Sequence, residues 1–177
     1  MTILETEGEL RTTLTTGNGD SVFSGRTDRI DCFNGQIRVI DYKTGQVHSA
    51  DLKLPVFHHG DSKLEYLKQI PEKALQLLLY KYLYLKMNPS VKPEQVTGAI
   101  HGLKTPSCIE YSLSKTSPTK KDADADTSFL DDPTFIADME TMLEAVVDEM
   151  LDTNIPFVQA EDDKKCEYCD FRLICKR

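Results

Sequence analysis

Three features are missing from this sequence of 177 residues: a long apolar run, a signal-peptide pattern and a positive net charge. No apolar run approaches the roughly 18 residues that a membrane-spanning helix needs, so we expect no membrane segment. Because no basic stretch precedes an apolar one near the amino terminus, we expect a cytoplasmic protein. Hydrophobic residues make up 40% of the chain, which argues against wholesale disorder and suits one domain.

The charge is unevenly distributed along the chain. Lys and Arg number 21 against 29 Asp and Glu, and this net charge of −8 alone argues against a nucleic-acid-binding protein. Residues 120–165, however, hold 14 acids and four bases, which leaves 15 acids and 17 bases elsewhere. The acidity is therefore regional and does not exclude a nucleic-acid partner.

The five cysteines are odd in number, which argues against a disulfide framework in a chain without an export signal. Cys166, Cys169 and Cys175 form a C-x2-C-x5-C pattern. Three soft ligands this close suit Zn²⁺ or an iron–sulfur cluster, each of which needs four. Cys32 and Cys108 are candidate fourth ligands, although both lie in expected strands, where a small buried thiol is the alternative. The alternative for the tail is three thiols without a metal.

The pattern of apolar and turn residues predicts five strands and two helices. Residues 44–70 and 115–128 lack periodicity and are expected to be loops, the second one solvated and mobile. A helix at Glu72–Met87 is apolar on most of its circumference, so we expect it to be buried. Strands are expected at 3–15, 22–33, 36–42, 96–103 and 108–113, with turns at 17–20 and 104–107. The second helix, 133–151, has an apolar stripe of Phe135, Met139, Met142, Leu143, Val146, Val147 and Met150.

The dipeptide Asn34-Gly35 lies between two segments rich in Val, Ile and aromatic residues. It is the strongest short signal for a β-hairpin with a two-residue turn. We expect the Asp31–Arg38 pair of this hairpin to be a surface ion pair that contributes little. The expected cross-strand partners are Phe33 with Gln36, Asp31 with Arg38, Arg29 with Ile40 and Asp28 with Asp41.

Asp28 and Asp41 are thus expected to face each other on one side of the sheet. Like charges placed directly opposite are destabilising, and a shared divalent cation is the natural compensation. Lys43 lies two residues beyond Asp41, so the strand period places its ammonium on the same face. The alternative is that Lys43 merely neutralises the two carboxylates at an exposed sheet edge.

Three segments, 25–31 (GRTDRID), 39–45 (VIDYKTG) and 76–80 (QLLLY), closely resemble the PD-(D/E)XK nuclease superfamily, specifically the RecB/AddB-type nuclease domain. With the cysteine tail, the resemblance extends from about residue 22 to 177. It implies a restriction-endonuclease-like α/β (α+β) fold with a central mixed β-sheet flanked by helices. Residues 1–165 would form the nuclease core, and residues 166–177 a cysteine-rich tail that packs on it.

The resemblance also implies roles for individual residues. Asp28, Asp41 and the backbone carbonyl of Tyr42 would hold Mg²⁺ or Mn²⁺. Lys43 would orient or activate the attacking water and counter the charge that develops on phosphorus. These two aspartates and Lys43 are the expected catalytic residues, together with the glutamine of the QxxxY motif.

That motif places Gln76 and Tyr80 on one helix face, because they are spaced i and i+4. The resemblance implies that Gln76 lines the active site and that Tyr80 and Arg26 contact the DNA strand. The alternative is a buried helix whose Gln and Tyr bond to the backbone.

Two ligands that the resemblance implies are not found at the matching positions. RecB-type domains usually have a metal-binding His upstream of the first strand, and His48, His58 and His59 are instead expected to be exposed loop residues. In AddB-type tails a fourth, upstream cysteine completes a [4Fe–4S] cluster. We therefore expect either the carboxy-terminal portion of a longer protein or a subfamily that lacks these ligands.

The expected function is metal-dependent hydrolysis of DNA phosphodiester bonds, of exonuclease type and acting on single-stranded ends. The partner would be a helicase domain or subunit, in double-strand-break repair. Retention of Asp28, Asp41, Lys43 and Gln76 favours this function over two alternatives. One is an inactive nuclease fold that only binds DNA or a partner subunit, and the other is a metal-stapled interaction domain whose tail carries the function.

Overall fold

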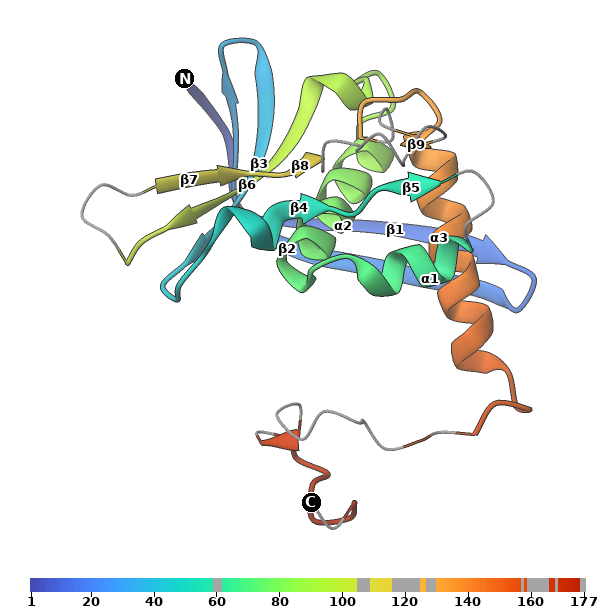
Figure 1. The fold of residues 1–177 in the computed structure, drawn as a ribbon. Helices are drawn as coiled ribbons and strands as arrows, with labels where there is room; N and C mark the ends of the chain where they lie inside the picture. The colour runs from blue at the N-terminus through green and yellow to red at the C-terminus, as the bar shows by residue number, and fades with distance from the viewer. Residues whose placement is uncertain are drawn as a thin grey trace.

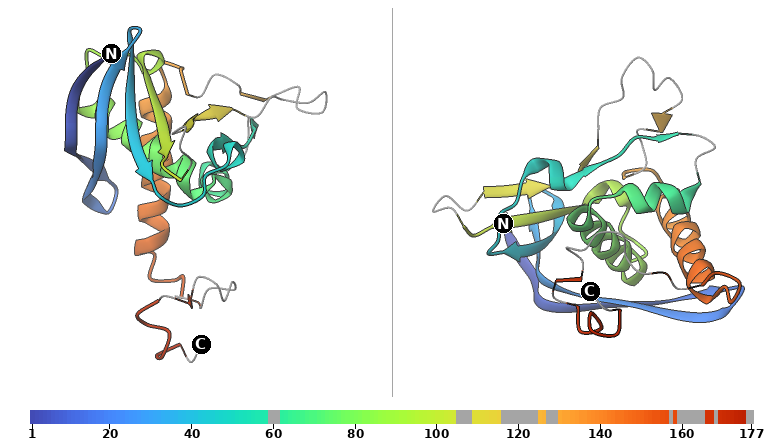
Figure 2. Two further views of the ribbon diagram at one scale, coloured as in Figure 1. Left: turned by 90° about the vertical axis from the view of Figure 1, so that its left-hand side faces the viewer. Right: turned by 60° about the horizontal axis from the view of Figure 1, so that its bottom comes forward.

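A five-stranded mixed sheet forms the centre of the computed structural model (Figure 1). Its strand order is β1-β2-β3-β6-β7, and the strands are β1 (Thr2–Thr16), β2 (Gly19–Phe33), β3 (Gln36–Lys43), β6 (Val96–Gly102) and β7 (Ile109–Ser112). The structure describes residues 1–58, 62–104, 109–115, 125–126, 130–156, 158, 166–167 and 169–175. The three α-helices of these ranges, α1 (Lys63–Gln69), α2 (Glu72–Met87) and α3 (Phe135–Leu151), lie on one side of the sheet (Figure 2). The expected mixed sheet with flanking helices is confirmed.

The two hairpins of the sheet have the expected positions. β1 and β2 are antiparallel around the turn at Gly17-Asn18, so the strand predicted at residues 22–33 begins three residues earlier. At the second turn, Asn34 and Gly35 have φ angles of 52° and 81°, as a turn that matches the strand twist requires. The predicted β2–β3 register is confirmed as far as Arg29 with Ile40, where the pairing ends. Asp28 and Asp41 are therefore not ladder partners, and that pair of the predicted register is wrong.

Helix α2 (Glu72–Met87) has the predicted bounds and connects β3 to the parallel strand β6. It is buried as expected because it packs closely on the sheet at two glycines. A Cβ atom on Gly98 would lie 2.8 Å from Leu77 Cβ, and one on Gly25 would lie 2.7 Å from Tyr80 Cε1. The helix therefore crosses both β6 and β2 at a distance that only glycine permits.

The loop predicted over residues 44–70 is wrong for much of its length. It contains a 3-10 helix η1 (Ser49–Leu52), the short strands β4 (Lys53–Leu54) and β5 (Phe57–His58), and helix α1 (Lys63–Gln69). Leu52, Leu54 and Tyr66 are buried in the core, so tertiary packing orders a segment that has no periodic pattern. A further 3-10 helix, η2 (Pro93–Gln95), precedes β6.

Two other predicted loops fall partly outside the described residues. β8 (Ser114–Lys115) pairs with β4, and β9 (Ala125–Asp126) pairs with β5. The rest of the predicted loop at 115–128, most of the turn at 104–107, His59 and Cys108 lie outside the described residues.

Helix α3 (Phe135–Leu151) begins two residues after the predicted start, and its apolar stripe is only partly buried. Phe135, Met139, Met142 and Leu143 of the predicted stripe lie in the core, whereas Met150 at its end is 67% exposed. The reason is that α3 extends beyond the elements on which its first half packs (Figure 1).

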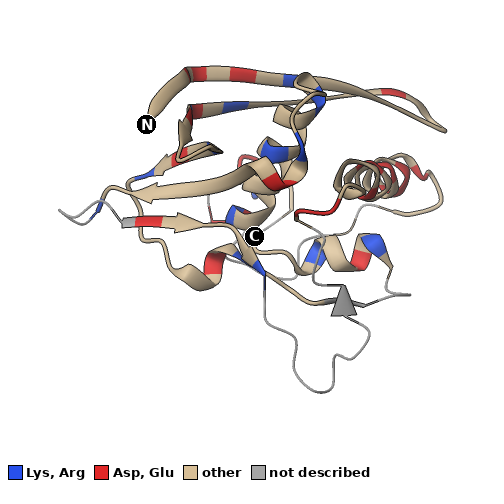
Figure 3. Ribbon diagram, turned by 90° about the horizontal axis from the view of Figure 1, so that it is seen from above, with Lys and Arg blue, Asp and Glu red and all other residues tan. Residues whose placement is uncertain are grey.

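Five of the 14 acidic residues of the region 120–165 lie on this helix. α3 carries five acids and no Lys or Arg (Figure 3). Three of the five pair with lysines of α1 and α2: Asp138 with Lys63 at 2.7 Å, Glu149 with Lys68 at 2.9 Å and Glu140 with Lys86 at 2.7 Å. Part of the acidic region therefore serves helix packing. No helix among the described residues is long and apolar enough to cross a membrane.

Candidate active site

Three of the predicted catalytic residues meet between β3 and α2. Lys43 Nζ lies 2.9 Å from Asp41 Oδ2, and Gln76 Nε2 donates a hydrogen bond of 3.1 Å to Asp41 Oδ1. Asp41 and Lys43 share a face of β3 because they are two residues apart. Helix α2 packs on that face and contributes Gln76, so each oxygen of the Asp41 carboxylate has one partner.

Tyr80 extends this network by one helical turn. Gln76 Nε2 donates a second hydrogen bond, of 2.8 Å, to the Tyr80 hydroxyl, and the Tyr80 ring lies against Gly25 of β2. The interpretation in which Gln76 and Tyr80 bond to the backbone is therefore wrong. Both side chains belong to one network with Asp41.

Asp28 joins the group from β2 through a contact that the expected pairing did not include. The β2–β3 ladder stops one residue before Asp28, and Asp28 Oδ2 accepts a hydrogen bond of 2.5 Å from the Tyr42 amide. The carboxylate takes the place of a backbone acceptor where the two strands part. This bond holds Asp28 beside the residue that follows Asp41.

A local irregularity of the first hairpin accompanies the position of Asp28. Ile30 lies in the core, and Gly25, five residues earlier, faces Tyr80 of α2. In a regular strand, residues five apart would point to opposite faces, so the pleat changes phase between them. Glu7, across from Asp28, has a φ of 52°, and this pair is missing from the β1–β2 register. Such irregularities redirect side chains and are common beside active sites.

The charges of this group suit a divalent cation. Asp28 and Asp41 supply two negative charges, and Lys43 supplies one positive charge. Asp41 Oδ2 is buried without a hydrogen bond, since Lys43 is close enough for an ion pair but does not meet hydrogen-bond geometry. Hard carboxylate oxygens are the ligands that Mg²⁺ prefers. By charge and ligand type, the carboxylates of Asp28 and Asp41 therefore fit a divalent cation, and the Tyr42 carbonyl stays a predicted ligand.

A pocket of about 320 Å³ adjoins this group and includes residues that sequence reasoning missed. Lys73 Nζ lies 2.8 Å from Asp51 Oδ2, and hydrogen bonding to Lys73 holds the pKa of Asp51 below its usual value. Lys73 precedes Gln76 by three residues, so helical periodicity would have found it on the same face. Asp51 lies in a segment without periodicity, and no sequence signal marked it. The lining residues are Lys43, Asp51, Pro71, Glu72, Lys73 and Gln76.

Arg26 is placed apart from this network. Its guanidinium lies 3.0 Å from Glu7 Oε2, and both side chains are well exposed. Within the described residues, no hydrogen bond or ion pair links Arg26 to Asp41, Lys43 or Gln76. Its predicted contact with DNA stays a prediction.

The predicted surface ion pair of Asp31 and Arg38 is wrong, because Asp31 is completely buried. Arg38 donates to both of its oxygens at 2.8 and 2.9 Å, and Arg29 lies 3.0 Å away. Arg38 also pairs with Glu110 of β7 at 2.7 Å, and the bond to Asp31 raises the pKa of Arg38. The sequence could not show this network, since the Glu110 that pairs with Arg38 comes from a strand 72 residues further along the chain.

Cys166, Cys169 and Cys175 are partly buried within short hydrogen-bonded turns. Among the residues that the structure describes, no three His, Cys, Asp or Glu side chains are placed to hold a metal ion. Cys32 in β2 is also only partly buried. The metal site of the tail stays a prediction.

Comparison with known proteins identifies the family. The model of the PD-(D/E)XK nuclease superfamily matches residues 2–176, and no curated protein matches the chain. Among solved structures, the chain is similar to the crystal structure of SSO0001, with 18% identity, a TM-score of 0.41, and coverage of 97% of this chain and 58% of that one. The five-stranded mixed sheet and its helices are consistent with a restriction-endonuclease-like fold. Because the family match spans nearly the whole sequence, the chain belongs to the PD-(D/E)XK nuclease superfamily.

Proposed function

We propose that this chain is the metal-dependent DNA nuclease domain of a RecB/AddB-type helicase–nuclease that acts in DNA repair in the cytoplasm. It hydrolyses phosphodiester bonds at single-stranded ends as an exonuclease. The observation that carries this proposal is the contact of Lys43 and Gln76 with the two oxygens of Asp41, beside Asp28. A helicase domain or subunit is the proposed partner.

In this proposal each residue has a separate task. Asp28, Asp41 and the Tyr42 carbonyl would hold Mg²⁺ or Mn²⁺, which when bound would polarise the phosphate and lower the pKa of a water. Lys43 is a cation and therefore no metal ligand; it orients the attacking water and counters the charge on phosphorus. Gln76 fixes the direction of the Asp41 carboxylate, and Tyr80 fixes Gln76. Water adds to phosphorus as the bond to the leaving oxygen breaks.

The test is Mn²⁺-dependent degradation of an end-labelled single strand by the wild type and by Lys43→Ala. Loss of one such electrostatic contact typically lowers the rate by about 10²–10³. Lys92→Ala is the matched control, because Lys92 is 74% exposed and only weakly paired. Wild-type cleavage by Lys43→Ala, or no cleavage by any form, contradicts the proposal.

Metal binding is tested separately by calorimetric titration with Mg²⁺ and Mn²⁺. We expect binding heat for the wild type and for Lys43→Ala, and none for Asp41→Asn, because only the last change removes a carboxylate ligand. Equal heats for wild type and Asp41→Asn would place the metal elsewhere. The alternative of an inactive, DNA-binding nuclease fold is supported only if DNA binds while neither metal nor cleavage is detected.

We further propose that residues 1–165 are the core and that Cys166, Cys169 and Cys175 attach the tail to it through a [4Fe–4S] cluster or Zn²⁺. The support is their C-x2-C-x5-C spacing, and a fourth ligand is needed. Anaerobic purification of this chain, with iron and zinc quantified, is the test. We expect iron or zinc in a longer protein that supplies a fourth ligand and little bound metal in this chain, whereas stoichiometric iron in this chain would make Cys32 or Cys108 the fourth ligand.

A further inference from the structure

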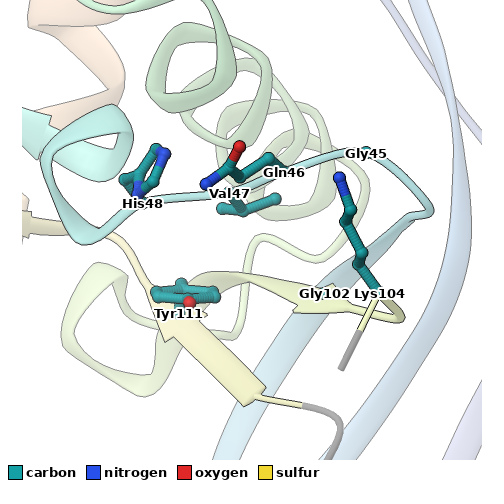
Figure 4. Close-up of a pocket in the computed structure, with 7 residues that line it drawn as sticks. All are labelled: Gly45, Gln46, Val47, His48, Gly102, Lys104 and Tyr111. Carbon is teal, nitrogen blue, oxygen red and sulfur yellow. The ribbon is translucent and has the colours of Figure 1, made fainter. Parts of the chain in front are cut away.

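A second pocket, of about 440 Å³, opens beside the proposed catalytic group where β3 and β6 end. Figure 4 shows the Tyr111 ring and the His48 imidazole at one side of it and Lys104 at the other. Val47 closes its floor toward the core. None of these residues has a part in the nuclease mechanism proposed above.

The sheet register places this pocket on the same face as Asp41. Asp41 pairs with Ile100, and Ile100 pairs with Tyr111, so the three side chains lie in one row across β3, β6 and β7. Strands are about 4.8 Å apart, which puts Tyr111 roughly 10 Å from Asp41. At about 3.4 Å per stacked nucleotide, a single strand spans this distance in about three nucleotides.

The backbone beyond Lys43 leads from the catalytic group to the wall of the pocket. Lys43 pairs with Gly102, and the Leu103 amide donates a 2.9 Å hydrogen bond to the Lys43 carbonyl. Two residues later, Gly45 begins the segment that forms one wall of the pocket. A strand whose phosphate lies at Lys43 would therefore pass the pocket mouth.

The chemistry of the lining suits a nucleobase. Tyr111 is half-buried, and with His48 it offers aromatic surface for stacking, while the exposed Gln46 amide can both donate and accept hydrogen bonds. Lys43 and Lys73 are paired with carboxylates, but Lys104 has no carboxylate partner among the described residues. An unpaired cation at the rim is suited to a backbone phosphate.

We propose that this pocket binds one unpaired base of single-stranded nucleic acid, stacked on Tyr111 with its phosphate near Lys104. The inference rests on the proposed function for the presence of DNA. It deepens that function by assigning the unpaired base to Tyr111 and its phosphate to Lys104, since a base within a duplex must be extruded before it can enter a pocket.

The first test measures binding without cleavage, in EDTA. Fluorescence anisotropy compares a labelled oligo(dT) of about ten nucleotides, within the site size of single-strand-binding folds, with an abasic oligomer of equal length. Stacking of one base predicts that Tyr111→Ala weakens oligo(dT) binding about 5- to 150-fold and leaves abasic binding unchanged. Tyr111→Phe, which keeps the ring, should bind as the wild type does. Phe33→Ala, an exposed aromatic at the far hairpin turn, is the matched control.

The second measurement is the salt dependence of binding. Lys104→Ala should reduce the slope of log K against log salt by about 0.7, the value for one phosphate contact on a single strand. Lys92→Ala should not change the slope. An unchanged slope for Lys104→Ala overturns the phosphate contact.

These outcomes separate the inference from the proposed nuclease. Cleavage by the wild type together with undiminished oligo(dT) binding by Tyr111→Ala overturns the pocket and leaves the nuclease standing. Tyr111-dependent binding without any Mn²⁺-dependent cleavage overturns the nuclease and leaves the pocket standing. If Tyr111→Ala does not fold, the wild type decides, because equal affinity for oligo(dT) and the abasic oligomer also overturns the pocket.

Discussion

The β2–β3 hairpin carries acidic side chains on both of its faces, and these carboxylates have different partners on the two faces. On the face away from α2, Asp31 is completely buried, and two arginines bind it. On the face toward α2, Asp41 keeps a buried oxygen without a hydrogen bond and shares its site with Asp28. In the first cluster two arginines balance one carboxylate, although Arg29 Nε is itself buried without a hydrogen bond, whereas the second cluster has two carboxylates against the single cation of Lys43. Unmatched charge beside a pocket is the signature of a functional site, whereas a closed ion-pair network is structural.

The largest expected effect tests this contrast through stability. Asp31→Ala leaves Arg29 and Arg38 without their buried partner, which typically costs about 3–5 kcal/mol. Asp28→Ala removes one hydrogen bond of a half-buried carboxylate and relieves repulsion with Asp41, so we expect a loss of about 1 kcal/mol or less. Urea unfolding of both variants gives the comparison. Equal losses would mean that the two faces do not differ as the structure indicates.

A second prediction concerns the pH dependence of stability and rests on Lys81, a buried charge of helix α2. The side chain of Lys81 is 2% exposed, its nearest carboxylate, Asp131, lies 3.9 Å away, and burial lowers the pKa of Lys81 to about 8. In the unfolded chain the Lys81 ammonium keeps its proton to about pH 10.5. Between pH 8 and pH 10.5 the unfolded state therefore binds more protons than the folded state. The free energy of unfolding should therefore rise from pH 8 to pH 10.5, by up to about 3 kcal/mol.

The measurement is urea unfolding across this pH range for the wild type, Lys81→Met and Lys92→Met. Lys81→Met should lose the rise, because its side chain does not titrate, and Lys92→Met should keep it. Parallel curves for the wild type and Lys81→Met would show that Lys81 is not the titrating group.

The third prediction sharpens the role of the helix-facing network. Gln76→Ala removes the residue that directs the Asp41 carboxylate, and such supporting contacts typically contribute about 10- to 100-fold in activity or metal affinity. We expect this loss in Mn²⁺-dependent cleavage and in metal affinity, with a change in melting temperature no larger than that of the control. Gln69→Ala, an exposed glutamine on α1, is that control. An active Gln76→Ala protein would assign Gln76 to helix packing alone.

The smallest expected effect is that of Arg26→Ala. Arg26 and its partner Glu7 are both exposed, so their ion pair should contribute less than about 0.5 kcal/mol to stability. If Arg26 contacts DNA, its removal should lower oligo(dT) affinity and reduce the salt slope by about 0.7. Unchanged affinity would remove Arg26 from the substrate-binding residues.

The sequence by itself determined the local elements with strong signals. The Asn34-Gly35 turn defined the hairpin and most of its register, and the run at Glu72–Met87 defined a buried helix. Strand and helix periods then placed Asp41 with Lys43 and Gln76 with Tyr80. These features depend on neighbours within a few residues, which is why a pattern reveals them.

Only the tertiary structure decided which of these groups meet and which are saturated. Arg38, which binds the buried Asp31, also pairs with Glu110 of a distant strand, and Asp28 bonds the Tyr42 amide because the strands part at that point. The pocket at Tyr111 likewise exists because β3 and β6 end, and the antiparallel β7 begins, at the same end of the sheet. Burial and the supply of hydrogen-bond partners are properties of the packed chain, since they depend on residues far apart in sequence.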